Sequence, residues 1–555
     1  MAAGANLGEK LFGMVKTIGP VFQSYALGLG LLDLAVGVAG AVILYFVVQS
    51  KIKKARKFRR DMEYGSARWG TEADIKPFVD PKFENNVILT GTEFLTMNTR
   101  PKIPASARNL NFCGIGSSGS GKTRFWLTPQ LLQAHSSYVV VDPKGGTLSQ
   151  CGYFLQKKKG YKVKVFNSID FSKSMHYNPM AYIKTESDVL KFVNALIANT
   201  KGDGKEGDEF WTKAETLLYC ALVAYIVFEG PEEERNMNTL VEMINSMEVR
   251  EDDESFKNAV DYMFDGLAKR NPQHFAVRQY AKYKLASGKT AKSILISAAV
   301  RLAPFNLPQI KAITDHDDMD LYTLGEKKCA LYAVIPDNDT TFNFLVSLLY
   351  SQIFQTLYYC ADQIHHGALP CHVHFILDEA PSVNLPGLPR ELATMRSRNI
   401  SCSTIIQNMA QIKELYKDSW ETIPGNSDTL LYLGGNESST HKYISEALGK
   451  STIDTKTHGQ TKGRSGSYST NFQMSGRELL TPDEVRMLDN RYCILFIRGA
   501  RPILDLKYEL MEHPAIRYTM DGGAPPYIHH GTAAPALTGE PLFQFYSNNE
   551  KENAA

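Results

Sequence analysis

Eight consecutive residues, Gly116 to Thr123, have the types and spacing of a phosphate-binding loop. They read Gly-Ser-Ser-Gly-Ser-Gly-Lys-Thr and fit the pattern G-x(4)-G-K-S/T at every fixed position. Glycines let successive backbone N–H groups turn toward phosphate oxygens, the lysine contacts the β- and γ-phosphates, and the hydroxyl that follows binds Mg²⁺. The pattern therefore predicts a nucleoside triphosphate site made of Gly116, Ser117, Ser118, Gly119, Ser120, Gly121, Lys122 and Thr123.

The second half of an ATPase site is predicted at the end of an apolar run far along the chain. Val373–Leu377 reads as a buried strand and is followed directly by Asp378 and Glu379. We expect Asp378 to hold the Mg²⁺ shell through water, and Glu379 to orient and activate the attacking water. An Asp-Glu pair alone could be a solvated strand end. Joined to the phosphate loop, it predicts binding of ATP with Mg²⁺ and ATP hydrolysis.

Two further positions could connect hydrolysis to movement. The expected strand Ser401–Ile406 ends in Gln407, whose amide could sense the γ-phosphate or could simply cap the strand. Arg398, with Arg396 just upstream, could reach the nucleotide of a neighbouring subunit as an arginine finger, or could be an ordinary surface residue. Gln407 and Arg398 are therefore candidate catalytic residues beside Lys122 and Glu379.

The elements that must position these groups alternate between strands and helices. Strands are expected at 109–113, 137–141, 162–166, 329–335, 373–377, 401–406 and 429–433, with closing strands at 492–497 and 503–507. This alternation, with polar residues at the strand ends, is typical of a mostly parallel, doubly wound α/β sheet. Between about Thr185 and Tyr322 the hydrophobic period is helical, which predicts an all-α domain inserted into the sheet domain.

An apolar run near the N-terminus predicts a membrane anchor. Ala26–Val48 is interrupted only by Asp33 and is long enough, at about 1.5 Å per residue, to cross a hydrocarbon core of about 30 Å. Seven of the ten residues from Lys51 to Arg60 are basic, which places this flank and the bulk of the chain on the cytoplasmic side. A buried core helix and a signal peptide are the alternatives to this single-pass anchor.

Composition sets few limits on partners. With 43% hydrophobic and 22% charged residues the chain is ordinarily globular, and a formal net charge of +2 neither requires nor excludes a nucleic acid. The eight cysteines form no C-x-x-C pair, so we interpret them as reduced core residues. His372 with His374 alternate on one strand, and His365-His366 lie in a loop; we interpret both pairs as core, cap or loop residues instead of metal ligands.

A series of short motifs resembles one family in its order along the chain. The motifs are Tyr64-Gly-Ser-Ala-Arg-Trp69, the phosphate loop, Val140-Val-Asp-Pro-Lys-Gly145, Tyr177-Asn-Pro179, Phe210-Trp211, Leu377-Asp-Glu-Ala-Pro381, Met395-Arg396, Ile406-Gln-Asn-Met-Ala-Gln411, Leu448-Gly-Lys-Ser-Thr452 and Leu479-Leu-Thr-Pro-Asp-Glu484. Over most of its length the chain thereby resembles the type IV coupling proteins of conjugation and type IV secretion. These are membrane-anchored ATPases akin to septal DNA translocases.

The resemblance, read with the sequence pattern, implies a definite domain organisation. A membrane anchor at 1–60 precedes a RecA-like P-loop nucleotide-binding domain at 61–184 and 323–520. This domain carries the inserted all-α domain at 185–322, and a flexible tail follows at 521–555. Within the second part of the RecA-like domain, the polar segment 451–475 is expected to be a mobile loop.

The resemblance also implies partners. It implies a homo-hexamer in the bacterial cytoplasmic membrane that recruits single-stranded DNA with its relaxase and passes it to a type IV secretion channel and its ATPase components. Proteins of this family commonly have two membrane helices, whereas only Ala26–Val48 is convincing here.

Three functions are compatible with these motifs. The first is an ATP-driven translocase of DNA or nucleoprotein. The alternative is a nucleotide-switched docking adaptor that links substrate to the secretion machinery without pumping. A substrate-modifying P-loop transferase is a third possibility, but no constellation of residues for an acceptor site is evident.

Overall fold

The computed structural model describes residues 31–54, 64–200, 209–250, 256–286, 288–383, 385–460 and 468–531. These residues form two compact units, and each is described by itself. The first unit contains the described residues within Met1–Ser66 and Thr452–Gly476. The second contains those within Ala67–Ser451 and Arg477–Ala555.

The N-terminal apolar run forms one long helix, α2 (Leu31–Lys54). Its window Leu34–Lys51 is long and apolar enough to cross a membrane, and its large apolar side chains are exposed. The start expected at Ala26 lies outside the described residues. The helix ends six residues later than expected because it continues into the basic flank, of which residues 55–60 are also outside the described part.

In the segment expected to be a mobile loop at 451–475, the described residues form a two-stranded sheet instead, and residues 461–467 lie outside the described part. Its strands are β10 (Lys450–Gln460) and β11 (Tyr468–Glu478). The expectation was wrong because it rested on polarity and on the content of glycine and serine. Strand pairing satisfies backbone N–H and C=O groups and does not depend on apolar side chains, and threonine, frequent in this segment, suits an extended backbone.

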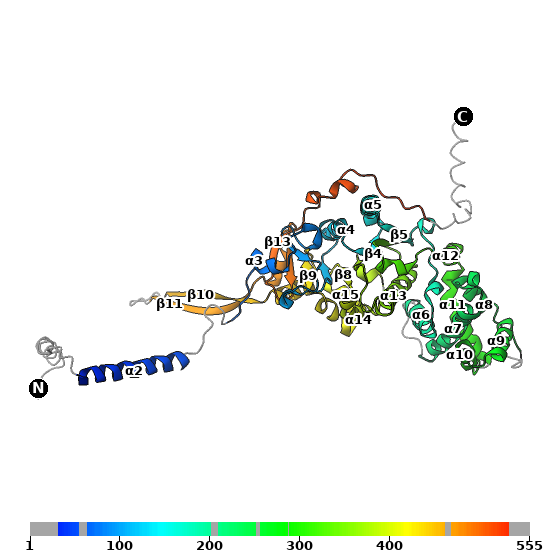
Figure 1. The fold of residues 1–555 in the computed structure, drawn as a ribbon, viewed down its shortest axis with the longest axis horizontal. Coiled ribbons are helices and arrows are strands. Elements are labelled where there is room, and N and C mark those ends of the chain that lie inside the picture. Colours follow the sequence, from blue (N-terminus) through cyan, green and yellow to red (C-terminus); the bar gives the residue numbers. More distant parts are fainter. Residues whose placement is uncertain are drawn as a thin grey trace, which may run out of the picture. The chain divides into compact units, whose positions relative to one another are not determined.

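A nine-stranded sheet forms the frame of the second unit (Figure 1). Its strands lie in the order β13-β12-β9-β3-β8-β7-β4-β6-β5. Their bounds are β3 (Phe112–Ile115), β4 (Ser137–Pro143), β5 (Lys162–Asn167), β6 (Cys329–Ile335), β7 (Val373–Leu377), β8 (Ile400–Ile406), β9 (Thr429–Tyr432), β12 (Tyr492–Ile497) and β13 (Ile503–Leu506). Neighbours from β9 to β5 are parallel, whereas β12 is antiparallel to both β9 and β13. The expected mostly parallel α/β sheet is confirmed.

Alternate residues of the central strands pack into two separate apolar cores. Tyr138 and Val140 of β4 belong to one core, and Val139 and Val141 belong to the other. Helices of both cores flank the sheet: α4 (Thr128–Gln133) and α5 (Gly146–Tyr153) belong to the first core, and α13 (Asn343–Tyr359), α14 (Leu388–Thr394), α15 (Met409–Tyr416) and α17 (Ser438–Leu448) to the second. Because the sheet is covered on both faces, the residues of its central strands β3, β7, β8 and β9 are buried throughout instead of alternating between buried and exposed.

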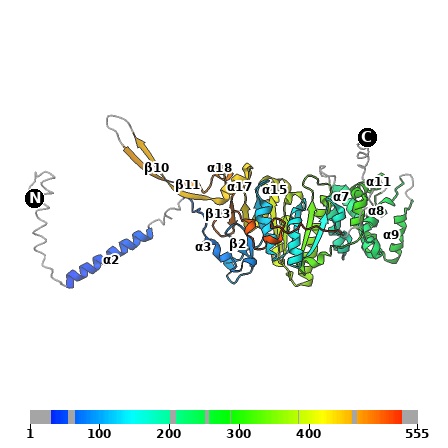
Figure 2. The same ribbon diagram turned by 90° about the horizontal axis from the view of Figure 1, so that it is seen from above.

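Between β5 and β6 the described chain is helical. The helices are α6 (Glu186–Asn199), α7 (Glu209–Glu229), α8 (Met237–Asn245), α9 (Ala259–Arg270), α10 (Phe275–Tyr283), α11 (Gly288–Leu302) and α12 (Pro308–Ile313). They lie together beyond α13, at the opposite end of the second unit from β13 (Figures 1 and 2). The apolar helix α7 packs against α6, α8, α10 and α11, and is mostly buried, so it is the core helix of this helical region.

The smaller elements complete the second unit. They are a two-stranded antiparallel sheet of β1 (Asn86–Ile88) and β2 (Phe94–Thr96), and the short helices α3 (Glu72–Ile75), α16 (Thr422–Gly425) and α18 (Pro482–Arg486). Of the expected flexible tail at 521–555, residues 532–555 lie outside the described part. The described residues 521–531 run beside α5, where the backbone N–H of Tyr527 donates to the carbonyl of Ser149 at 3.0 Å.

Candidate nucleotide-binding site

The phosphate loop connects β3 to a helix, as the sequence predicts. The loop leads into the π-helical turn η4 (Lys122–Leu127), which continues as α4. Gly121 has a φ of +84°, a conformation that favours glycine. A Cβ atom at Gly116 would lie 2.4 Å from Ser120 Oγ. Side chains at these two positions would therefore distort the loop.

Lys122 reaches back across the loop. Its Nζ donates hydrogen bonds to the carbonyl oxygens of Gly116 at 2.9 Å and Ser117 at 3.3 Å. Burial lowers the pKa of this ammonium group, while the nearby carboxylates of Asp378 and Glu379 act in the opposite direction. The positive charge is thus held inside the loop, where it would face the phosphates of a bound nucleotide.

Asp378 lies beside the phosphate loop although it is distant in sequence. Thr123 Oγ1 donates a hydrogen bond to Asp378 Oδ2 at 3.1 Å across 255 positions of the chain. Asp378 is buried, and its Oδ1 has no hydrogen-bond partner among the described residues. Burial raises the pKa of Asp378, against the effects of the Thr123 hydroxyl and the Lys122 charge. A hydroxyl and a carboxylate with a spare oxygen are the donors that Mg²⁺ prefers, so these residues fit the ion.

Glu379 and Gln407 meet at the same edge of the sheet. Glu379 follows β7 with a φ of +55°, which turns the chain sharply after the strand. Gln407 follows the neighbouring strand β8, and its Nε2 donates to Glu379 Oε1 at a long 3.4 Å. Because β8 lies between β3 and β7, the phosphate loop, the carboxylates and the amide all lie at the carboxyl ends of three adjacent strands.

Comparison with known proteins identifies the family to which this arrangement belongs. Residues 95–510 match the protein family described as "Type IV secretory system Conjugative DNA transfer". The chain belongs to this family of coupling proteins. The resemblance drawn from the sequence motifs is thereby confirmed.

Named coupling proteins resemble the chain over most of its length. It is 27% identical to the protein VirD4 of Rhizobium radiobacter over 70% of this chain and 55% of the relative. It is 26% identical to the conjugal transfer protein TraG of Escherichia coli over 82% of this chain and 75% of that protein. The chain therefore spans about half the length of the VirD4 relatives that it matches.

Solved structures of the bacterial conjugative coupling protein TrwB share the fold. The form in complex with sulphate has a TM-score of 0.58 at 16% identity and covers 82% of this chain and 96% of TrwB. TrwB in complex with ADP and Mg²⁺ has a TM-score of 0.55 at 16% identity and covers 80% and 96%. At this identity the likeness concerns the fold of the coupling proteins.

Arg398 lies at the other end of β8 from Gln407. Its guanidinium makes hydrogen bonds of 2.8 to 3.1 Å to both carboxylate oxygens of Asp362, and it stacks over the ring of Tyr358 at 4.5 Å. Arg396 donates instead to the carbonyl oxygen of Thr99. In this coupling-family chain the candidate finger is therefore not brought to the phosphate loop of its own subunit.

Sequence reasoning missed Lys507, which supports the phosphate loop. It follows β13, and its Nζ donates to the carbonyl of Ser120 at 2.9 Å and to Asn490 Oδ1 at 2.8 Å. Burial lowers the pKa of Lys507 to about 8. A single lysine at the end of an edge strand carries no motif, so only the packing of β13 near the loop reveals this contact.

His374 of β7 is part of the sheet interior, and His372 lies half-buried directly before this strand. His374 contacts the hydroxyls of Ser401 and Ser403 at 2.5 and 2.8 Å, and the Nδ1 atom of His372 lies 2.7 Å from Ser136 Oγ. Burial lowers the pKa of His372 to about 4 and also lowers the pKa of His374. These contacts agree with the interpretation as core residues. All eight cysteines are free, and all except the half-buried Cys371 are buried, as expected.

Proposed function

We propose that this chain is a membrane-anchored ATPase that drives transfer of relaxase-bound single-stranded DNA into a type IV secretion channel. The observation that carries this proposal is the contact between Thr123 and Asp378 at 3.1 Å, which joins the phosphate loop to the acidic pair at the end of β7. Membership of the conjugative DNA transfer family supports the choice of substrate. The complex of TrwB with ADP and Mg²⁺ supports the choice of ligands.

Each residue of the site would have one role. Lys122 and the backbone N–H groups of the loop would bind the β- and γ-phosphates, and Thr123 and Asp378 would hold Mg²⁺. The ion supplies charge neutralisation on the phosphate oxygens. Glu379 would accept the proton of the attacking water. The Nε2 atom of Gln407 donates a hydrogen bond to Glu379, so the position of the Gln407 amide would change when Glu379 contacts the attacking water. This movement would pass the state of the nucleotide to β8 and α15.

The assembly proposed for this activity is a homo-hexamer in the bacterial cytoplasmic membrane. Helix α2 would be its single anchor per chain, with the second unit in the cytoplasm. Residues 61–184 and 323–520 would form the RecA-like domain, and 185–322 the inserted all-α domain. DNA would pass through the central pore toward the secretion channel and its ATPase components.

Arg398 would contact the nucleotide of a neighbouring subunit, because its own phosphate loop lies at the opposite edge of the sheet. Loss of an arginine finger costs about 10³-fold or more in turnover, so Arg398→Ala should abolish ATP hydrolysis without weakening ATP binding. Asp362→Asn is the matched control, since it breaks the same ion pair but leaves the guanidinium in place. Equal losses in the two variants would show that the arginine is structural.

The test of the whole proposal is ATP hydrolysis by the full chain in detergent, with and without single-stranded DNA. Stimulation by DNA that disappears in Lys122→Ala would support a translocating motor. If a preparation shown to be hexameric binds ATP but is not stimulated by DNA, the proposal fails and the nucleotide-switched docking adaptor takes its place.

A further inference from the structure

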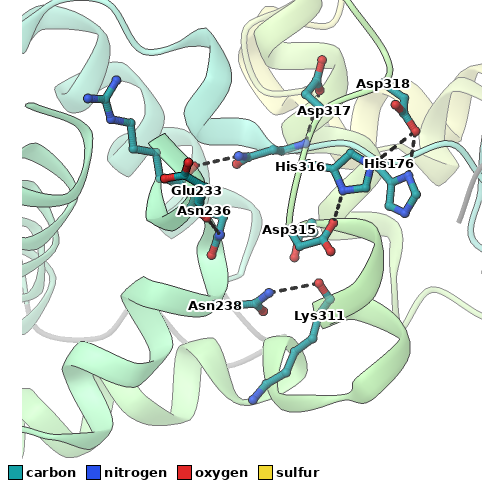
Figure 3. Close-up of polar contacts among 12 residues, drawn as sticks. His176, Glu233, Asn236, Asn238, Lys311, Asp315, His316, Asp317 and Asp318 are labelled. Carbon is teal, nitrogen blue, oxygen red and sulfur yellow. Dashed lines mark hydrogen bonds and ion pairs between the residues drawn. The ribbon is translucent and has the colours of Figure 1, made fainter. Parts of the chain in front are cut away.

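Three side chains that could bind a metal ion converge where the helical region joins the sheet. The potential ligand atoms of His176, His316 and Asp318 all lie within 4.8 Å of one another. Asp318 Oδ2 is 2.6 Å from His176 Nδ1 and 3.7 Å from His316 Nε2 (Figure 3). Within the described residues, no other group of histidine, cysteine or acidic side chains has this geometry.

A second carboxylate orients one of these histidines. Asp315 Oδ1 lies 2.6 Å from His316 Nδ1, on the opposite side of the ring from Asp318. When the Nδ1–H group of His316 donates a hydrogen bond to Asp315, the lone pair of Nε2 is directed toward Asp318. A carboxylate behind the ring is the usual way in which proteins orient a metal-binding histidine and raise its basicity.

The backbone holds the two segments in register before any metal binds. The N–H of Asp318 donates to the carbonyl of His176 at 3.0 Å, and the N–H of Tyr177 donates to the carbonyl of Ile313 at 2.7 Å. Lys164 of β5 donates to the carbonyls of Met319 and Asp320, directly after Asp318. The ligands are therefore positioned by structure that does not depend on their own side chains.

One side of the cluster opens to a cavity of about 750 Å³. His316 and Asp315 line it from one segment, and Glu233, Arg235 and Asn236 line it from the connection between α7 and α8. The side chain of His316 is about half exposed, whereas that of His176 is buried. A metal ion at the cluster would thus be held from the protein side and accessible from the cavity.

We propose that His176, His316 and Asp318 bind a divalent transition-metal ion, with Zn²⁺ as the best match, and leave a coordination position open toward the cavity. Two imidazoles and one carboxylate suit Zn²⁺, while Mg²⁺ and Ca²⁺ prefer oxygen ligands throughout. Three protein ligands are typical of zinc sites that keep an exchangeable fourth position. Water or a carboxylate or imidazole from a docked protein would fill it.

The position of the cluster in the chain gives the ion a structural consequence. His176 lies before α6, the first helix of the helical region, and His316 and Asp318 lie after α12, the last. The ion would link the two segments through which the chain leaves the sheet for the helical region and returns to it. It would limit how far the helical region moves relative to the sheet, independently of the nucleotide site.

The test is zinc titration of the full chain, without a polyhistidine tag, in detergent. Excess Mg²⁺ is kept present so that zinc does not occupy the Thr123–Asp378 site, and a chromogenic chelator reports free zinc. We expect one tight Zn²⁺ per chain. His316→Ala should abolish tight binding, and Asp315→Asn should weaken it about 10- to 100-fold. His365→Ala is the matched control, because it removes a histidine paired with a carboxylate, Glu326, outside the cluster.

Substitution with Co²⁺ identifies the ligand type directly. Visible d–d absorption without a thiolate charge-transfer band, lost in His316→Ala and kept in His365→Ala, supports the proposal. Two results overturn it: zinc affinity in His316→Ala equal to that of the unmodified chain, or a thiolate band, which would assign the ion to cysteines. The side chains of His316 and Asp315 are about half exposed. The thermal unfolding temperature measured without metal should therefore be the same in His316→Ala, in Asp315→Asn and in the unmodified chain.

Discussion

The nucleotide site and the His176–His316–Asp318 cluster are both built from residues distant in the chain, but they are assembled in different ways. At the nucleotide site, short motifs follow β3, β7 and β8 and meet because parallel neighbouring strands end at one edge of the sheet. In the cluster, His176 and Asp318 are 142 positions apart, on either side of the seven α-helices α6 to α12 that the structure describes there. They meet only because the helical region returns to its starting point.

The largest expected effect separates the two sites by chemistry. Glu379→Gln should lower ATP turnover about 10²- to 10⁴-fold, because the amide cannot accept a proton from water. Binding of a fluorescent ATP analogue and zinc affinity should both remain unchanged, since the amide is similar in size and the cluster shares no residue with the site. Phosphate release measures the turnover, and titrations with the ATP analogue and with zinc measure the two affinities. A parallel loss of zinc binding would show that the two sites are not independent.

The second effect concerns His374, which is buried in the sheet, and His372, which is half-buried directly before β7, in contrast to the exposed His316. The pKa of His372 is lowered to about 4 by burial, so between pH 6.5 and 4 the folded chain binds fewer protons than the unfolded chain. Stability is therefore lost as pH falls through this range, by about 3 kcal/mol for His372 alone. Asp142, with a pKa raised to about 6, opposes part of this loss.

Urea unfolding at a series of pH values measures that loss. His372→Gln should make stability less dependent on pH below 6.5, because glutamine gains no proton. An unchanged slope in His372→Gln would contradict the assignment.

A smaller effect is expected from a residue that supports the segment carrying His316 and Asp318. Lys164→Met removes hydrogen bonds to the buried carbonyl of Met319 and to the partly buried carbonyl of Asp320 and hydroxyl of Thr323. We expect the free energy of unfolding to fall by about 1–3 kcal/mol. Zinc affinity should fall about tenfold, the smallest effect typical of residues that support metal ligands without binding the ion. Lys162→Met, two residues earlier and exposed, is the matched control. Thermal unfolding and zinc titration distinguish the two variants.

The smallest expected effect lies at the edge of the nucleotide site. Gln407→Ala removes the 3.4 Å contact to Glu379 but leaves the phosphate loop and both carboxylates in place. Hydrolysis without DNA should persist, while stimulation by DNA falls about fivefold, the low end of coupling between two sites. Glu414→Ala, on the exposed face of α15, should retain stimulation. Equal stimulation in Gln407→Ala and the unmodified chain would leave Gln407 as a strand-end cap.

Much of the frame was predictable because its signals are local. The bounds expected for β6, β7 and β12 agree with the structure, since apolar runs of strand length mark them in the sequence. The described residues of segment 451–475 were assigned wrongly, because a polar strand pair has no such apolar signal. Lys507 was missed for another reason, since its role depends on which loop lies beside the end of β13.

The sequence by itself determined the phosphate loop, the Asp-Glu pair, the apolar helix and the family. In each case the chemistry is carried by neighbouring residues, or by motifs that a parallel sheet must bring together. Only the tertiary structure decided that Arg398 pairs with Asp362, that Lys507 supports the loop, and that His176 meets His316 and Asp318. Contacts of this kind depend on how long segments pack and return, and no local pattern of residues encodes the distance between two points far apart in the chain.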